Sequence, residues 1–302
     1  MRRAAGGTRR GFTILEIITS LLIISIIGLA MTRLIIGQTR SFQFENGARR
    51  ARAAARGAMN ILITDLRMTQ DQGGVTYVDA TNNRRVDVRV PVVFGFVCEI
   101  TATSTVIALV PADSFQVASA KYGGYAVRDS LTGQYTYAAA TSGDTIQPAN
   151  ANRCHAGPNI YADTATVAGR AGGVFIASPA PPAGTAIGAP VFVWQTVTYE
   201  FKTSGVYSGR FGLYRVVRGR ANTDTLSEEL MSPFSTSARF GYYTNPAATN
   251  DVPTTTAPGT LNTIRGFQIY LPAESSDTMP TRSSPQTTNL TTAVFFKNTR
   301  IQ

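Results

Sequence analysis

The sequence has very little of what enzymatic and metal-binding sites are built from. Its 302 residues include one histidine, two cysteines and one tryptophan, and only 15% are Asp, Glu, Lys or Arg. With His155 as the single imidazole, the chain lacks the means for most nucleophile–base arrangements and for the usual zinc ligand sets. The chain also has no glycine-rich phosphate loop, no helical His-x-x-x-His and no calcium-loop spacing. We therefore expect that the protein is not an enzyme and that it binds no cofactor and no metal.

Charge is scarce, and much of it is concentrated near the N-terminus. The formal net charge is +10, but Arg2, Arg3, Arg9 and Arg10 supply four of these charges, so the chain from Phe12 onward carries +6. Four more arginines stand close together, namely Arg49, Arg50, Arg52 and Arg56. The remainder is nearly balanced, which argues against a protein that coats nucleic acid. A body rich in Thr, Ser, Ala, Gly and Asn is typical of an exported, loop-rich β domain.

The longest hydrophobic run lies from Gly11 to Met31, and Glu16 is its only charge. A run of this length is sufficient to cross a bilayer, which takes about 20 residues. Because clustered arginines before an apolar segment stay in the cytoplasm, we expect the N-terminus to be cytoplasmic and the rest of the chain to be exported.

The residues of this run allow three interpretations. It is a secretory signal with Gly28-Leu29-Ala30 as its cleavage site, a twin-arginine signal that uses Thr8 to Phe12, or an element retained in the mature protein. Neither signal explains an acid early in the run, where a charge costs about 2.5 kcal/mol or more. Neither explains why helical patterning continues for about forty further residues. Both observations favour a retained element.

One continuous helix is predicted over residues 12 to about 70, because no proline interrupts this range and Gln72-Gly73-Gly74 forms a plausible stop. Its first half, residues 12–36, is apolar on all sides, as in a membrane-embedded or bundle-buried helix. Its second half, residues 37–72, is amphipathic. Small and apolar residues recur there at spacings of three and four, at Ala48, Ala51, Ala55, Ala58, Leu62 and Leu66. We expect this stripe to pack on the exported domain.

Residues 75–302 are predicted to form that domain, with β-strands separated by long loops. The predicted strands are 86–96, 98–110, 191–202, 211–218, 239–243, 264–271 and 292–297, with breaks at Pro91 and Gly95. Along 191–202 the apolar side chains alternate with polar ones, which indicates a half-buried strand. The segments 178–190, 244–263 and 272–291 are expected to be surface loops.

Several residues that could carry chemistry are expected to have structural roles. Trp194 lies within a regular strand and is expected in the core. Glu228-Glu229 and the acidic residues from Glu274 to Asp277 are expected to be solvated. Cys98 and Cys154 are a possible disulfide, because export places them in an oxidising compartment, but two separate buried thiols remain an alternative.

The segment Arg10-Gly11-Phe12-Thr13-Ile14-Leu15-Glu16 resembles the class III signal of type IV prepilins and type II secretion pseudopilins. In that family a short basic leader ends in glycine, phenylalanine begins the mature chain, and glutamate stands fifth. The resemblance implies that prepilin peptidase removes residues 1–11 by cleavage between Gly11 and Phe12, and then N-methylates Phe12. It also implies that Glu16 pairs with the terminal amine of a neighbouring subunit during assembly.

Weaker similarities narrow the choice within the family. The Arg- and Ala-rich helix, the segment FGLYRVVRG and the C-terminal pair IRGFQIYL and TTAVFFKNTR resemble PilW-type minor pilins and the J-type minor pseudopilin of type II secretion. Many major pilins have proline at the twenty-second mature position, where this chain has Arg33, which could snorkel to an interface.

The predicted fold class is therefore α+β and pilin-like: a long N-terminal helix packed on an antiparallel β-rich domain. The expected function is that of a minor subunit, first in the inner membrane and then at or near the tip of a type IV pilus or related filament. Its expected partners are prepilin peptidase, other minor and major pilins or pseudopilins, the inner-membrane assembly platform and membrane lipid. A secretion pseudopilin, a membrane-anchored adhesin and a DNA-uptake pilin using the arginines near position 50 are alternatives; nucleic acid is otherwise not expected as a partner.

Overall fold

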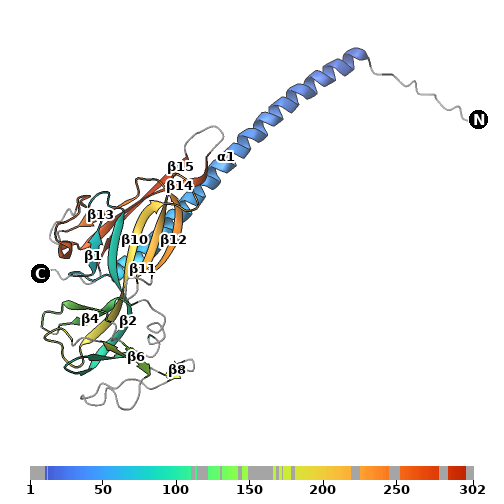
Figure 1. Cartoon of the computed structure of the whole chain (residues 1–302). Coiled ribbons are helices and arrows are strands. Elements are labelled where there is room, and N and C mark those ends of the chain that lie inside the picture. The colour runs from blue at the N-terminus through green and yellow to red at the C-terminus, as the bar shows by residue number, and fades with distance from the viewer. Residues whose placement is uncertain are drawn as a thin grey trace, which may run out of the picture.

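The computed structural model describes the following residues of the chain: 11, 13–109, 113, 122–129, 131–141, 145–148, 166–167, 170–171, 173–177, 181–218, 225–244, 252–278 and 285–296. A single long helix, α1 (Ile14–Met68), leads into a β-rich domain and projects far beyond it (Figure 1). The helix has 55 residues, which corresponds to about 83 Å at 1.5 Å per residue. The predicted helix over residues 12 to about 70 is thus confirmed within two residues at each end.

The ends of α1 follow from local chemistry. Thr13 is the N-cap, and its hydroxyl oxygen accepts a hydrogen bond from the backbone N–H of Glu16 at 3.3 Å. Such a cap satisfies one of the free N–H groups of the first turn. At the other end, Thr69 adopts an extended conformation and Gln72 and Gly73 have positive φ. The predicted stop at Gln72-Gly73-Gly74 therefore lies four residues beyond the last helical residue.

The strands that follow are antiparallel throughout. Within the described residues, thirteen of them form one curled sheet whose central order is β13-β14-β12-β11-β10-β2-β3-β9-β6, and β7 and β8 form a separate pair. The main strands are β2 (Arg85–Ile100), β10 (Pro190–Thr203), β11 (Phe211–Arg218), β12 (Thr225–Phe234), β13 (Arg239–Tyr243), β14 (Gly266–Thr278) and β15 (Pro285–Phe295). The shorter elements are β1 (Val75–Val78), β3 (Thr105–Leu109), β4 (Gly124–Arg128), β5 (Tyr135–Ala139), β6 (Thr145–Pro148), β7 (Thr166–Val167), β8 (Arg170–Ala171), β9 (Gly173–Ala177) and the 3-10 turn η1 (Leu261–Thr263). The predicted α+β class is confirmed.

Strands β2 and β10 run through two lobes of the domain, each with its own core (Figure 1). On β2, Val86, Val88 and Val90 belong to the core beneath α1, whereas Val93 and Val97 belong to the second core. The buried residues of β2 thus change from even-numbered to odd-numbered positions, and a bulge causes this change. Val193 is opposite Val93 but Trp194 is opposite Pro91, which leaves Val92 as an extra residue. The predicted break at Pro91 is therefore wrong, because a bulge accommodates a residue without an N–H inside a continuing strand.

A half-buried arginine joins the end of α1 to the second lobe. Arg89 donates from Nη1 to the carbonyl of Gly73 at 2.8 Å, and its guanidinium lies 4.5 Å from the ring centre of Tyr137 and 4.8 Å from that of Trp194. Burial lowers the pKa of Arg89. Gly73 has φ +104°, and a Cβ there would lie 2.9 Å from the Tyr137 ring, so glycine is required for this close contact.

Small residues let the second half of α1 lie close against β12, β14 and β15. Five of the six residues of the predicted stripe are fully or almost fully buried and Ala48 is half-buried; the five are Ala51, Ala55, Ala58, Leu62 and Leu66. Gly47 lies against Ser275, and Gly57 faces the tip of Met231 so closely that a Cβ would overlap with it. The amphipathic pattern thus predicted the docking face correctly.

Candidate functional site

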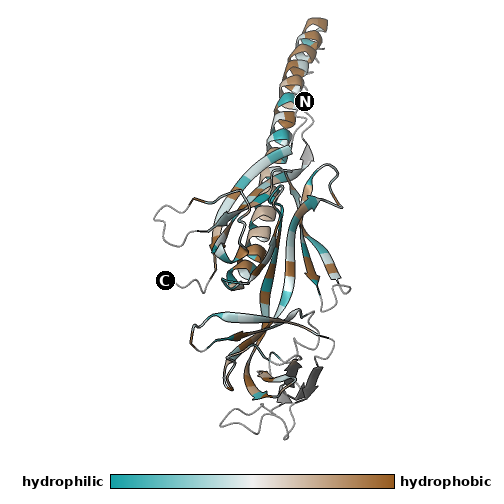
Figure 2. Ribbon diagram, turned by 60° about the vertical axis from the view of Figure 1, so that its left-hand side comes forward, coloured by the Kyte–Doolittle hydropathy of each residue, from teal (hydrophilic) through white to brown (hydrophobic). Residues whose placement is uncertain are grey.

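The first half of α1 makes no contact with the domain along most of its length. Figure 2 shows it as a largely apolar rod that extends beyond the strands. Its large apolar side chains from Ile14 to Ile36 are 45–79% exposed. The first residue that is half-buried is Gly47, so the free part comprises residues 14–46, about 50 Å of helix. Isolated apolar side chains are common on protein surfaces, but a continuous apolar surface of this kind marks an interaction site.

The free half of α1 has the properties of a membrane-spanning segment. Within the described residues it is the one helix long and apolar enough to cross a membrane, a property that signal sequences share. Its hydroxyl groups are satisfied within the helix: Ser20, Ser25 and Thr32 donate to the carbonyl four residues earlier at 2.7–2.8 Å. Because no polar hydrogen of these residues needs water, the segment is compatible with lipid or with an apolar bundle.

Glu16 lies in the first turn of this free half and is exposed. A carboxylate at this end is favoured by the partial positive charge of the helix N-terminus. No ion pair among the described residues involves Glu16. Gly11 is also exposed, and Phe12 lies outside the described residues. Cleavage after Gly11, methylation of Phe12 and the assembly role of Glu16 stay predictions, as does the division of the chain at residues 11, 36 and 72.

The docked half of α1 is tied to the sheet by polar contacts that the sequence analysis did not find. Asp65 accepts a hydrogen bond from the hydroxyl of Tyr199, and it pairs with Arg215 at 3.3 Å. Tyr199 is fully buried. Its pKa is raised, first by burial and then by the negative charge of Asp65. These three residues come from α1, β10 and β11, so only the register of the neighbouring strands brings them together.

Two further ion pairs close the ends of this interface. Arg265 pairs with Asp71 just beyond the helix at 2.8 Å. Arg210 pairs with Glu274 at 3.4 Å and also donates to the carbonyl of Ser275. The expectation that Glu274 is simply solvated is wrong, because its side chain is only 13% exposed.

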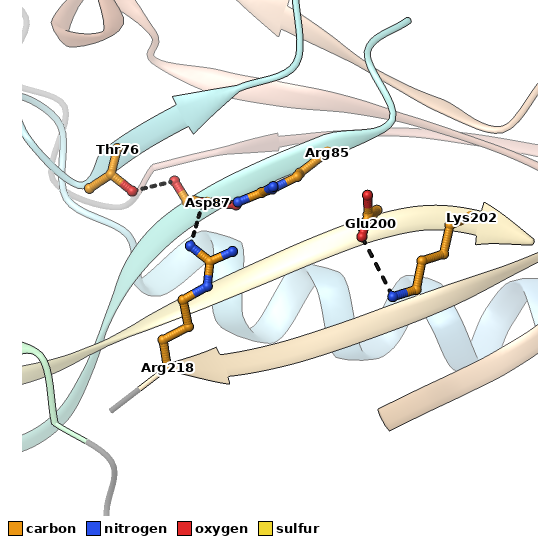
Figure 3. Close-up of polar contacts among 6 residues, drawn as sticks. All are labelled: Thr76, Arg85, Asp87, Glu200, Lys202 and Arg218. Atoms are coloured by element: carbon orange, nitrogen blue, oxygen red, sulfur yellow. Dashed lines mark hydrogen bonds and ion pairs between the residues drawn. The ribbon is translucent and has the colours of Figure 1, made fainter. Parts of the chain in front are cut away.

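The opposite face of the sheet carries a separate set of charges near the crossing of β2, β10 and β11 (Figure 3). Asp87 pairs with Arg85 at 2.7 Å and with Arg218 at 3.4 Å, and Lys202 lies 3.7 Å from Glu200. The hydrogen bond to Asp87 is the main cause that raises the pKa of Arg85. Among the described residues each of these charges lies within 4 Å of one of opposite sign, and Asp87 is shared by two arginines.

Glu229 also has a role that its sequence context did not indicate. It accepts hydrogen bonds from the hydroxyl of Tyr214 at 2.7 Å, from the N–H of Gly205 at 2.9 Å and from the hydroxyl of Ser204. Burial alone would raise the pKa of the Glu229 carboxyl, but these hydrogen bonds together hold it below its ordinary value. Glu229 therefore organises the β10–β11 turn, whereas Glu228 is exposed as expected.

Of Trp194, Cys98, Cys154 and His155, the structure describes the first two. Trp194 is buried, as predicted. Cys98 is buried on β2 and is not a free thiol. Cys154 and His155 lie outside the described residues, so the pairing of Cys98 with Cys154 stays a prediction.

Comparison of the chain with protein-family models, with curated proteins and with solved structures gives no significant match. The architecture itself is pilin-like: a long apolar N-terminal helix whose distal half packs on an antiparallel sheet.

Proposed function

We propose that this protein is a minor pilin or pseudopilin subunit that acts by assembly rather than by catalysis. The observation that supports the proposal best is the free half of α1, an exposed apolar rod of about 50 Å continuous with a half that is firmly docked. Full burial of each Ile or Leu side chain stabilises by about 1.5–3 kcal/mol. A protein with this segment gains stability from the bilayer first and from neighbouring helices afterwards.

The continuity of α1 favours a retained segment over a disposable signal. Residues 28–30, the possible signal cleavage site, lie inside an unbroken helix. Cleavage there would leave residues 31–46 as a free helix but would remove most of the apolar run that can cross a membrane. Cleavage after Gly11 instead keeps the whole apolar rod in one continuous helix with the docked half, which the Asp65 contacts hold against the sheet.

The chemistry of assembly follows from the residues at the start of the rod. Removal of residues 1–11 by prepilin peptidase frees an α-amine on Phe12, whose ordinary pKa of about 7.7–8.0 makes it mostly cationic. In an apolar bundle this amine needs an acidic partner, and Glu16 is the only acid between Ile14 and Phe44. Glu16 of one subunit then pairs with Phe12 of the next and sets the register between them.

The proposal places the chain in the inner membrane before assembly, with the domain exported. Its partners are the assembly platform and other pilins or pseudopilins of a type IV pilus or a type II secretion pseudopilus. A DNA-uptake pilin is a second candidate, because Arg49, Arg52 and Arg56 are exposed on the helix. Salt-dependent binding of DNA by the full chain would favour that candidate.

The decisive experiment is intact-mass analysis of the membrane-extracted protein after co-expression with a prepilin peptidase. The proposal expects a chain that begins at Phe12 and is one methyl group heavier than the unmodified chain. A chain that begins at Met31, or that retains the leader, would overturn it.

Assembly is tested with Glu16→Gln, and Glu45→Gln serves as the matched control because Glu45 is the other acid in the free half. We expect both variants to be cleaved but only Glu16→Gln to be missing from sheared filaments. Normal incorporation of Glu16→Gln would contradict the pairing role.

A further inference from the structure

The part of α1 between its apolar run, residues 14–32, and the domain forms a distinct neck, residues 33–46. The run ends at Thr32, and the first helix residue that is half-buried is Gly47, where an added Cβ would lie 3.2 Å from the Cβ of Ser275. The neck is thus 14 residues long, which corresponds to about 21 Å. Its side chains up to residue 46 are exposed.

The neck carries two positive charges and one negative charge. Its charged residues are Arg33, Arg40 and Glu45, and Glu45 pairs with Arg49 at 3.5 Å. Arg33 and Arg40 are both exposed, and no ion pair or hydrogen bond within the described residues involves either guanidinium. These two guanidinium groups are therefore available to a partner from outside the chain.

Helix geometry places these two arginines on one face. Seven residues separate Arg33 from Arg40, which is two turns of helix and about 10 Å along the axis. Gly37 lies between them on the same face, and nothing lies within 4 Å of the position that its Cβ would occupy. The result is an open gap, with a backbone floor and a guanidinium at each end. Phe44, 46% exposed, continues this face by one further turn.

The apolar run sets the depth of this gap in a membrane. Residues 14–32 span about 28 Å as a helix, close to the thickness of the hydrocarbon core, which is about 30 Å. Arg33 then lies at the boundary on the side of the domain. Because helical side chains point back toward the N-terminus, Arg40 also reaches the headgroup layer. Phe42, 68% exposed, lies just beyond Arg40 on the opposite side of the helix, as expected of an aromatic residue at an interface.

We propose that Arg33 and Arg40 bind the phosphate of an anionic phospholipid over Gly37, in the leaflet on the side of the domain. This inference rests on the proposed membrane insertion of α1. The continuity of the gap with the apolar run favours lipid, since the phosphate layer lies where the run ends. Guanidinium groups suit this ligand because their planar donors match phosphate oxygens.

The proposal is tested with the full chain in vesicles of phosphatidylcholine and phosphatidylglycerol, by electron spin resonance of trace spin-labelled lipid of each kind. The association constant for the anionic label is expected to exceed that for the zwitterionic label, by about fivefold per arginine. The double variant Arg33→Gln, Arg40→Gln should abolish this preference.

The double variant Arg52→Gln, Arg56→Gln is the matched control, because it removes the same charge outside the neck. It should leave the preference for the anionic label unchanged. Gly37→Leu keeps the charges but fills the floor, and should weaken the preference.

Each contrary outcome has a distinct meaning. An equal preference in the wild type and in the Arg33/Arg40 variant, or an equal loss in both double variants, overturns the lipid site. Loss of filament incorporation with an unchanged lipid preference assigns the two arginines to acidic groups of a neighbouring subunit and also overturns it. Failure of the chain to insert contradicts the proposed function and this inference together, whereas insertion without lipid preference contradicts only the inference.

Discussion

The two halves of α1 share one continuous backbone but differ in the size of their apolar residues. The docked half presents Ala51, Ala55 and Ala58 to the sheet, followed by Met59, Leu62 and Leu66 towards its end, and these residues are almost completely buried. The free half presents Ile and Leu on all sides, and they are exposed. Small residues allow the helix and sheet backbones to approach closely. Large apolar residues on all sides are buried only when lipid or other helices surround the helix. Residue size therefore directs one half to the domain and the other to lipid or to other subunits.

The two halves also use their acids differently. Asp65 is satisfied by Tyr199 and Arg215 within the chain, whereas Glu16 is exposed. A carboxylate with internal partners stabilises the fold, and a carboxylate without them is available for another molecule. The contrast between the halves can be tested by changing the same type of residue in each.

The largest expected effect is on the packing of the docked half. Leu62→Ala should lower the free energy of unfolding by about 2–5 kcal/mol, because Leu62 is fully buried and its truncation leaves a cavity. Leu22→Ala, in the free half, should change it by less than about 0.5 kcal/mol in detergent. Denaturant unfolding of the detergent-solubilised chain measures both. Equal losses would show that the free half also packs on the domain.

An intermediate effect is expected for the acids of the two halves. Asp65→Asn removes the charge that pairs with Arg215 and weakens the hydrogen bond from buried Tyr199, so it should lower the free energy of unfolding by about 1–3 kcal/mol. Glu16→Gln makes the same chemical change in the free half and should leave unfolding unaffected. The same denaturation assay compares them, and destabilisation by Glu16→Gln would mean that Glu16 has a partner within the chain.

The smallest effect concerns Glu229, which lies in the domain away from the helix. Glu229→Gln should cost about 1 kcal/mol at neutral pH. Because the folded-state pKa of Glu229 is lowered, its contribution is fully present above the ordinary pKa of about 4.3 and is lost as pH falls through the folded-state value.

Unfolding measured between pH 7 and pH 3 should therefore show a smaller loss of stability in Glu229→Gln than in the wild type. Glu228→Gln, at the exposed neighbouring position, is the control and should follow the wild-type profile. A steeper acid loss in Glu229→Gln than in the wild type would contradict the hydrogen-bonding role.

Strands rich in aromatic and β-branched residues were predictable from the sequence, and polar strand segments were not. Residues 211–218 and 239–243 form strands with the predicted bounds, and residues 191–202 differ by one residue at each end. By contrast, β12 was missed, and the predicted loop over residues 272–291 is wrong because β14 continues to Thr278 and β15 begins at Pro285. These extensions carry few apolar residues, and their strands form because backbone groups pair with a neighbour already in place.

What the sequence by itself determined is everything that depends on local periodicity: a helix without proline, an apolar run with one acid at Glu16, and a stripe of alanines on the helix face that docks. Tertiary structure alone decided where the helix ceases to be free, at Gly47, and which partners Asp65 and Glu229 acquire. It also decided how β2 serves two cores through the bulge at Val92. The physical reason is range: side-chain spacing sets which face of an element is apolar, but a polar contact between α1, β10 and β11 depends on strand register across some 150 residues of chain.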